Sequence, residues 1–189
     1  MKWFLPFLGF ICVAELVAKY QVLILDEHLI KIHYVIGIIE SIFYGYVFYR
    51  LSNSHFLKKI IFFFVPISVV SYLVTYFFYK NIFSYFITNI IISGFFLAVI
   101  ALLYLYMKFA DDDETLLISE PGFWIALGVS LFYSGISISL SLYDFIILND
   151  LQLFGVRLYN FASRVLSVIL YSCISISIIL CKKKNKISL

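Results

Sequence analysis

Long runs of apolar residues alternate with short clusters of charge along the whole chain. Because a helix needs about 20 apolar residues to cross the hydrocarbon of a bilayer, each run predicts one membrane-spanning helix. The runs lack the apolar-out, polar-in alternation of a membrane β-barrel. The pattern therefore predicts an all-α polytopic transmembrane helix bundle of six spans, at residues 3–20, 32–49, 60–79, 82–107, 122–142 and 159–181.

The composition indicates a chain that is almost entirely committed to the membrane. Of its 189 residues, 63% are hydrophobic and only 13% are charged. A water-soluble domain of this size keeps too much of its surface wet to hide that much apolar material. The longest hydrophilic stretch, 108–120, is too short to fold by itself. We therefore expect a single membrane domain over residues 1–189 that is surrounded by the lipid bilayer.

Basic residues predict the orientation of the spans. The net charge of +3 does not indicate nucleic-acid binding, because the basic side chains lie at the edges of the apolar runs, where they orient helices and meet anionic headgroups. With six spans, the N-terminal side of the membrane holds nine of them (Lys2, Arg50, Lys58, Lys59, Lys108, Lys182, Lys183, Lys184 and Lys186) and the other side holds five (Lys19, Lys31, Lys80, Arg157 and Arg164). Since basic residues favour the cytoplasmic side, we expect both termini in the cytoplasm and the chain in the inner (plasma) membrane.

Three connecting segments carry further signals. Ser119, Glu120 and Pro121 predict the start of the fifth span, as a helix cap, a first-turn acid and an early-helix proline. The segment 143–156 mixes polar residues with Phe and Ile. It predicts an outer loop that contains a short helix lying on the membrane interface. The acidic cluster at 111–114 is expected in a cytoplasmic loop.

Ionisable residues inside the spans are the best pointers to a site, because each is costly to place in a bilayer. In the first span, Glu15 precedes Lys19 by four residues. This spacing favours an ion pair on one face of a helix. We interpret Glu15 and Lys19 as a structural ion pair near the outer interface.

Glu40 lies near the middle of the second span and has no basic residue three or four positions away. Its own helix offers His33 two turns before it and Tyr44 one turn after it. The carboxyl group is then either protonated or paired with another helix, so Glu40 is either structural glue or a ligand or proton site. Small residues recur every four positions over 37–45, a surface that suits close helix contact and also permits a homo-oligomer.

The outer half of the bundle is expected to be more polar than the inner half. In the sixth span, three-and-four spacing gives one polar stripe, made of Arg157, Asn160, Arg164, Ser167, Tyr171 and Ser175. Asp144 and Asp150 precede this stripe, and Asn89 falls at a similar depth. These residues indicate either a cap of mutually paired charges, which we favour, or an outward-facing pocket. The candidate binding residues are Glu40, His33, Tyr44, Asn89, Arg157 and Arg164.

The sequence contains no motif for soluble-type catalysis, metal binding or nucleotide binding. His28 and His33 are five residues apart, which suits neither one helix face nor the H-E-x-x-H pattern of zinc enzymes. A P-loop, a G-x-S-x-G turn and a dinucleotide fingerprint are all missing. We therefore expect no metal, no cofactor and no catalytic residue of these types.

One stretch of the chain carries a resemblance to a family. Residues 120–128 read EPGFWIALG and continue through LFYSG at 131–135. This stretch resembles a family of small six- to seven-span bacterial inner-membrane proteins of uncharacterised function, in which a proline–aromatic–Trp start is followed by a glycine-bearing helix. The Glu in the first span, and His33 and Glu40 followed by Phe43 and Tyr44, look similar too. The resemblance spans most of the chain and implies a likeness to the membrane portions of sensory or signalling systems.

Three functions fit these features. The first is a non-enzymatic integral membrane protein, a sensor, accessory or partner-docking module that passes a helix shift to a cytoplasmic protein partner. The second is a small channel or proton-coupled transporter that uses Glu40. The third is a membrane-embedded lipid-modifying enzyme, in which Glu40, His33 and the arginines position a phosphate or carbonyl group. We expect the first.

Overall fold

The computed structural model describes residues 6–7, 9–11, 13, 28–78, 82–110 and 117–187. The described chain is predominantly helical, which confirms the all-α prediction. Four helices are long and apolar enough to cross a membrane, judged by length and composition over the described residues. These four are His55–Phe77, Ile87–Ala110, Pro121–Ser141 and Leu158–Lys183.

The order of the elements follows the predicted runs closely. The described elements are α2 (His28–Leu51), α3 (His55–Phe78), α4 (Ile82–Ala110), the 3-10 turn η1 (Leu117–Ser119), α5 (Pro121–Ser141), α6 (Tyr143–Leu148), β1 (Gln152–Leu153), β2 (Val156–Arg157) and α7 (Leu158–Ile187). Several helices continue past the apolar run that predicts them, because backbone hydrogen bonds extend a helix beyond its lipid-compatible part. Most of the predicted first span, with Glu15 and Lys19, lies outside the described residues, as does the acidic cluster at 111–114.

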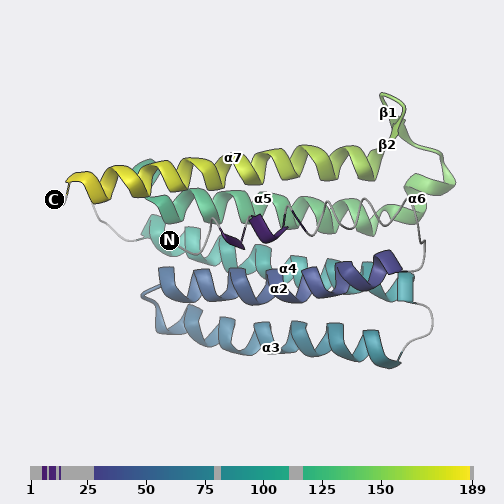
Figure 1. The fold of residues 1–189 in the computed structure, drawn as a ribbon, viewed down its shortest axis with the longest axis horizontal. Helices are drawn as coiled ribbons and strands as arrows, with labels where there is room; N and C mark the ends of the chain where they lie inside the picture. The colour runs from purple at the N-terminus through teal and green to yellow at the C-terminus, as the bar shows by residue number, and fades with distance from the viewer. Residues whose placement is uncertain are drawn as a thin grey trace.

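The long helices run up and down side by side (Figure 1). In the middle of the bundle, α4 packs against α2, α3 and α5, and α5 packs against α4 and α7. One end of the bundle carries the C-terminus and the short loop between α2 and α3, and the other end carries α6 with β1 and β2. The described chain therefore forms one bundle with two chemically different ends.

Aromatic and aliphatic side chains fill the interior of this bundle. Phe48, Ile125 and Ile174 are fully buried, at 0% exposure. On the outside, Phe62 and Phe77 are about 70% exposed, at 69% and 72%. A soluble protein rarely exposes so many large apolar side chains together, whereas lipid covers them at no cost. The surface thus indicates a membrane protein, in agreement with the four apolar helices.

The small residues predicted on the second span serve contacts within the chain. A Cβ atom added at Gly37 would lie 2.8 Å from Cζ of Tyr72 in α3, closer than side-chain carbons come. At Gly45, such an atom would meet Val65, again in α3. The two glycines therefore let α3 approach α2, so a homo-oligomer of this chain needs a different surface.

The start of α5 differs in detail from the prediction. Ser119 ends the 3-10 turn η1, and Glu120 takes the N-cap position, with Pro121 in the first turn. The cap assigned to Ser119 is therefore wrong, because the extended backbone that precedes the helix belongs to Glu120. The Glu120 carboxylate makes no cap hydrogen bond and instead pairs with Lys108 at the end of α4, with 3.3 Å between Nζ and Oε2.

The segment after α5 contains the short helix that the sequence predicts, and also a hairpin that it does not. The helix is α6, at Tyr143–Leu148. After it, β1 and β2 pair antiparallel, with Leu153 opposite Val156. Phe154 and Gly155 form the turn with φ of 53° and 74°, the left-handed geometry that a two-residue hairpin loop requires at both positions.

Candidate functional site

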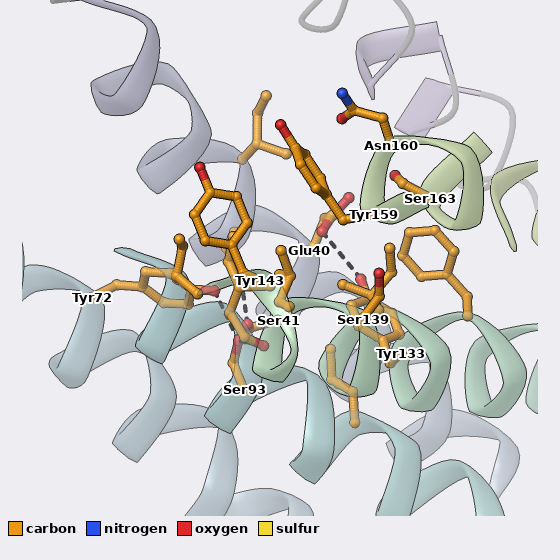
Figure 2. A pocket seen from close by; sticks show the side chains of 18 residues that line it. Glu40, Ser41, Tyr72, Ser93, Tyr133, Ser139, Tyr143, Tyr159, Asn160 and Ser163 are labelled. Atoms are coloured by element: carbon orange, nitrogen blue, oxygen red, sulfur yellow. Dashed lines mark hydrogen bonds between the residues drawn. The ribbon is translucent and has the colours of Figure 1, made fainter. Parts of the chain in front are cut away.

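A cavity of about 510 Å³ lies inside the bundle and is lined by residues of α2, α3, α4, α5, α6 and α7. Its polar lining residues are Glu40, Ser41, Tyr72, Ser93, Tyr133, Ser139, Tyr143, Tyr159, Asn160 and Ser163 (Figure 2). The rest of the wall is made mainly of isoleucine and leucine. An apolar cavity with a few convergent polar groups is the usual form of a small-molecule site.

Glu40 connects the two halves of the bundle across this cavity. The hydroxyl of Tyr133 in α5 donates a hydrogen bond to Oε2 of Glu40 in α2, with 3.1 Å between the oxygens. Figure 2 draws this bond as the dashed line between the two side chains. Behind it, the ring of Tyr44 packs edge-on against Tyr133, with 5.7 Å between ring centroids. Both tyrosines are buried, so the Glu40–Tyr133 bond is held in a fixed geometry.

Hydrogen bonds also hold other polar groups of the cavity wall. The hydroxyl oxygens of Tyr72 in α3 and Ser93 in α4 lie 2.8 Å apart, and either one can donate. The hydroxyl of Ser41 donates to the backbone carbonyl of Gly37 at 2.8 Å. These polar groups are therefore positioned by bonds within the protein before any ligand is present, which lowers the ordering cost of binding.

The cavity reaches the surface at the end of the bundle that carries α6. Tyr143 and Tyr159 line it there, with 5.1 Å between their ring centroids. Asn160, one residue further along α7, is both exposed and part of the lining. Partial burial and, to a smaller extent, the electrostatic interaction with Tyr159 raise the pKa of the Tyr143 hydroxyl above its usual value. This phenol is therefore neutral at physiological pH.

Toward the other end of the bundle, the interior is closed. Phe48, Ala101, Ile125 and Ile174 are all 0% exposed and belong to one apolar cluster. In α2, α4 and α7 these residues follow the cavity-lining residues, and in α5 Ile125 precedes them. They therefore lie toward the end of the bundle that carries the α2–α3 loop. Among the described residues, the Glu40 cavity thus has exposed lining near α6 and buried apolar side chains beyond its other end.

Of the predicted binding residues, Glu40 lines the cavity and Tyr44 packs directly behind it. Asn89 is also buried, but it is placed elsewhere, between α3 and α4. Its Oδ1 accepts a hydrogen bond from Ser71 at 2.7 Å, and its Nδ2 donates one to Thr75 at 2.7 Å. Asn89 therefore joins two helices and does not form part of the cavity wall.

The remaining predicted residues do not join Glu40. Arg157 in β2 and Arg164 in α7 are exposed, and neither lines the cavity. His33 lies in α2, and its side chain is outside the described part of the chain. Among the described residues, no ion pair joins either arginine to Asp144 or Asp150. The described part of the chain thus contains a pocket around Glu40 and lacks the ion pairs of the charged cap that we favour from the sequence.

Sequence reasoning misses all four tyrosines among the described residues that line the cavity. Tyr72, Tyr133, Tyr143 and Tyr159 all contribute to its wall. With 15 tyrosines in the chain, none of these four stands out by type or spacing. The signal available was the polar face of the fifth span, where Tyr133 follows Ser130 by three residues and precedes Ser137 by four.

The described residues contain no group of three or more His, Cys, Asp or Glu side chains that could hold a metal ion. No family model, curated protein or solved structure matches the chain. The function is therefore argued from the geometry of the Glu40 cavity alone.

Proposed function

We propose that the chain is a non-enzymatic receptor of the plasma membrane, which binds a small ligand in the Glu40 cavity and passes a helix shift to a cytoplasmic protein partner. The observation that carries this proposal is the cavity of about 510 Å³ around Glu40, a volume typical of small-molecule sites. Its wall combines α2 with α5, so an occupant contacts both halves of the bundle. A ligand that binds one packing of the two halves more tightly than another shifts the equilibrium toward that packing.

For the topology we keep the expectation of six spans with both termini in the cytoplasm. The four apolar helices support it, α2 adds a helix of 24 residues, and the apolar run at 3–20 adds the sixth span. In this arrangement α6 rests on the outer interface, the cavity opens outward, and the lysine-rich C-terminus meets the cytoplasmic leaflet.

A proton-coupled transporter is the second candidate, because Glu40 places an acid on the cavity wall within the bundle. Transport requires a path to the other side, and the buried apolar cluster around Phe48 and Ala101 in the described part of the chain argues against one. The closed end favours the receptor. In proteoliposomes, dissipation of a pH gradient by the wild type but not by Glu40→Gln would support transport, and no flux from either would support the receptor.

The proposal is tested by filling the cavity from one wall. Ser163 in α7 lines the cavity, whereas Ser172 in the same helix is exposed on the outside. Wild type, Ser163→Phe and Ser172→Phe are purified into nanodiscs and released intact into a mass spectrometer. We expect a bound small molecule on wild type and Ser172→Phe, and none on Ser163→Phe. Equal masses of bound material on all three, or a bare wild-type protein, would contradict the proposal.

A further inference from the structure

The described cavity wall carries an acidic side chain and no basic one. Glu40 is the one acidic side chain among the described lining residues, and these residues include no Lys, Arg or His. A ligand with a negative group would meet no opposite charge there and would lie beside a carboxyl group. The lining therefore disfavours anions and favours a positively charged group next to Glu40.

Aromatic rings add to this preference. Five aromatic residues line the cavity: Tyr72, Tyr133, Tyr143, Tyr159 and Phe132. In the view of Figure 2, Tyr72 and Tyr143 lie to one side of Glu40 and Tyr133 to the other. The face of an aromatic ring carries partial negative charge and attracts ammonium groups, most strongly where water is excluded. A carboxyl group among several aromatic rings is thus suited to an organic cation.

The remaining wall defines the rest of the ligand. Apolar side chains make up much of this wall: Ile36, Ile87, Ile90, Ile136 and Leu140. They suit a ligand whose body is hydrocarbon or aromatic. An inorganic cation such as calcium or magnesium fits less well, because these ions take several oxygen ligands. Glu40 supplies the single carboxyl group of the described wall.

From these observations we infer that the Glu40 cavity binds a small organic cation: a protonated amine that pairs with Glu40, attached to an apolar body that packs against the isoleucines. This inference rests on the proposed function, since it names the class of ligand for the same cavity. It goes further because it states the sign of the ligand's charge and names Glu40 as the residue that binds the charged group.

The experiment uses three probes that share a phenyl ring and differ in charge: 2-phenylethylammonium, 2-phenylethanol and 3-phenylpropionate. Radiolabelled 2-phenylethylammonium is bound to the full chain in nanodiscs, and the unlabelled probes compete for it. We expect the cation to compete at least tenfold better than the alcohol and the acid not to compete. Glu40→Gln should weaken binding of the cation at least tenfold. The matched change Glu120→Gln, at the Lys108 ion pair outside the cavity, should leave it unchanged.

Two results would overturn the inference: equal competition by the alcohol or the acid in the wild type, or unchanged binding of the cation by Glu40→Gln. The selectivity series in the wild type decides the matter even where Glu40→Gln fails to fold. These results are distinguishable from a failure of the proposed function. Suppose that the labelled cation does not bind, while mass spectrometry finds another molecule on wild type that Ser163→Phe lacks. The receptor proposal is then supported and the inference of a cationic ligand is wrong. If nothing binds in either experiment, both fall.

Discussion

Tyr133 and Glu40 come from positions 93 residues apart, and their hydrogen bond joins α2 to α5. Both side chains are tied to α2: Tyr133 of α5 packs edge-on against Tyr44 of α2, and Glu40 lies one turn before Tyr44 on the same helix. A hydrogen bond between two packed helices restricts how they move relative to each other, most strongly where water has little access. At the scale of single residues, this pair is the centre of the site.

Removal of the Tyr133 hydroxyl tests the strength of this bond. We expect Tyr133→Phe to lower the free energy of unfolding by about 1–3 kcal/mol, because a buried hydrogen bond to a carboxyl group is lost. The measurement is the thermal unfolding midpoint of the purified protein. Tyr106→Phe is the control, since Tyr106 is 71% exposed on α4. Equal midpoints for Tyr133→Phe and the control would contradict the assigned bond.

Asn89 is expected to behave differently from Glu40, because it lies between α3 and α4 and outside the cavity. Asn89→Ala removes two side-chain hydrogen bonds, to Ser71 and Thr75, and should lower the unfolding free energy by roughly 1–2 kcal/mol. It should leave the ligand retained by the protein in native mass spectrometry unchanged. Loss of the ligand at unchanged stability would instead place Asn89 in the site.

At the scale of the elements, the hairpin after α6 depends on the turn at Phe154 and Gly155. Gly155 has a φ of +74°, where a side chain costs about 1–2 kcal/mol. We expect Gly155→Val to open the hairpin and to speed hydrogen exchange of the amides of β1 and β2 roughly 5–30-fold. Phe154→Leu is the control, because it keeps a side chain of similar character at the neighbouring turn position. Unchanged exchange in Gly155→Val would contradict the turn geometry.

The sequence predicts the helices well and their partners poorly. Apolar runs locate α3, α4, α5 and α7 because a span must be long and apolar to cross a bilayer, and each run falls mostly within its helix. The hairpin escapes prediction because its strands have two residues each, too few for an alternating pattern. The short helix α6 is predicted, since the segment 143–156 mixes polar residues with Phe and Ile.

The site is only half predictable for a related reason. Glu40 is identified because an acid in an apolar run is costly, and this holds whatever the helix packs against. Tyr133 carries no such signal, since tyrosine is common in this chain and tolerated at many depths of a membrane. Which tyrosines meet Glu40 depends on which helices are neighbours, and apolar runs alone do not specify the order of helices in a bundle.

At the scale of the whole molecule, the two ends of the bundle have different roles in the proposed function. The α6 end holds the mouth of the cavity, with Tyr143, Tyr159 and Asn160. The other end is closed by buried apolar side chains and carries the Lys108–Glu120 pair and the C-terminus. A signal received at the first end must then cross the packed core to reach a partner at the second, and α2 and α5 are the helices that connect the two.

The most direct measurement of this account is the side from which water-soluble reagents reach the cavity. A variant with its three native cysteines replaced by serine receives a single cysteine at Ser139, which lines the cavity. Asn53→Cys lies in the loop between α2 and α3, which the proposed topology places in the cytoplasm, and it provides the reference. Intact cells and inverted vesicles are treated with a membrane-impermeant methanethiosulfonate. We predict that Ser139→Cys reacts in intact cells and not in inverted vesicles, and that Asn53→Cys does the reverse. Reaction of Ser139→Cys from the cytoplasmic side, or from neither side, would contradict a cavity that opens outward.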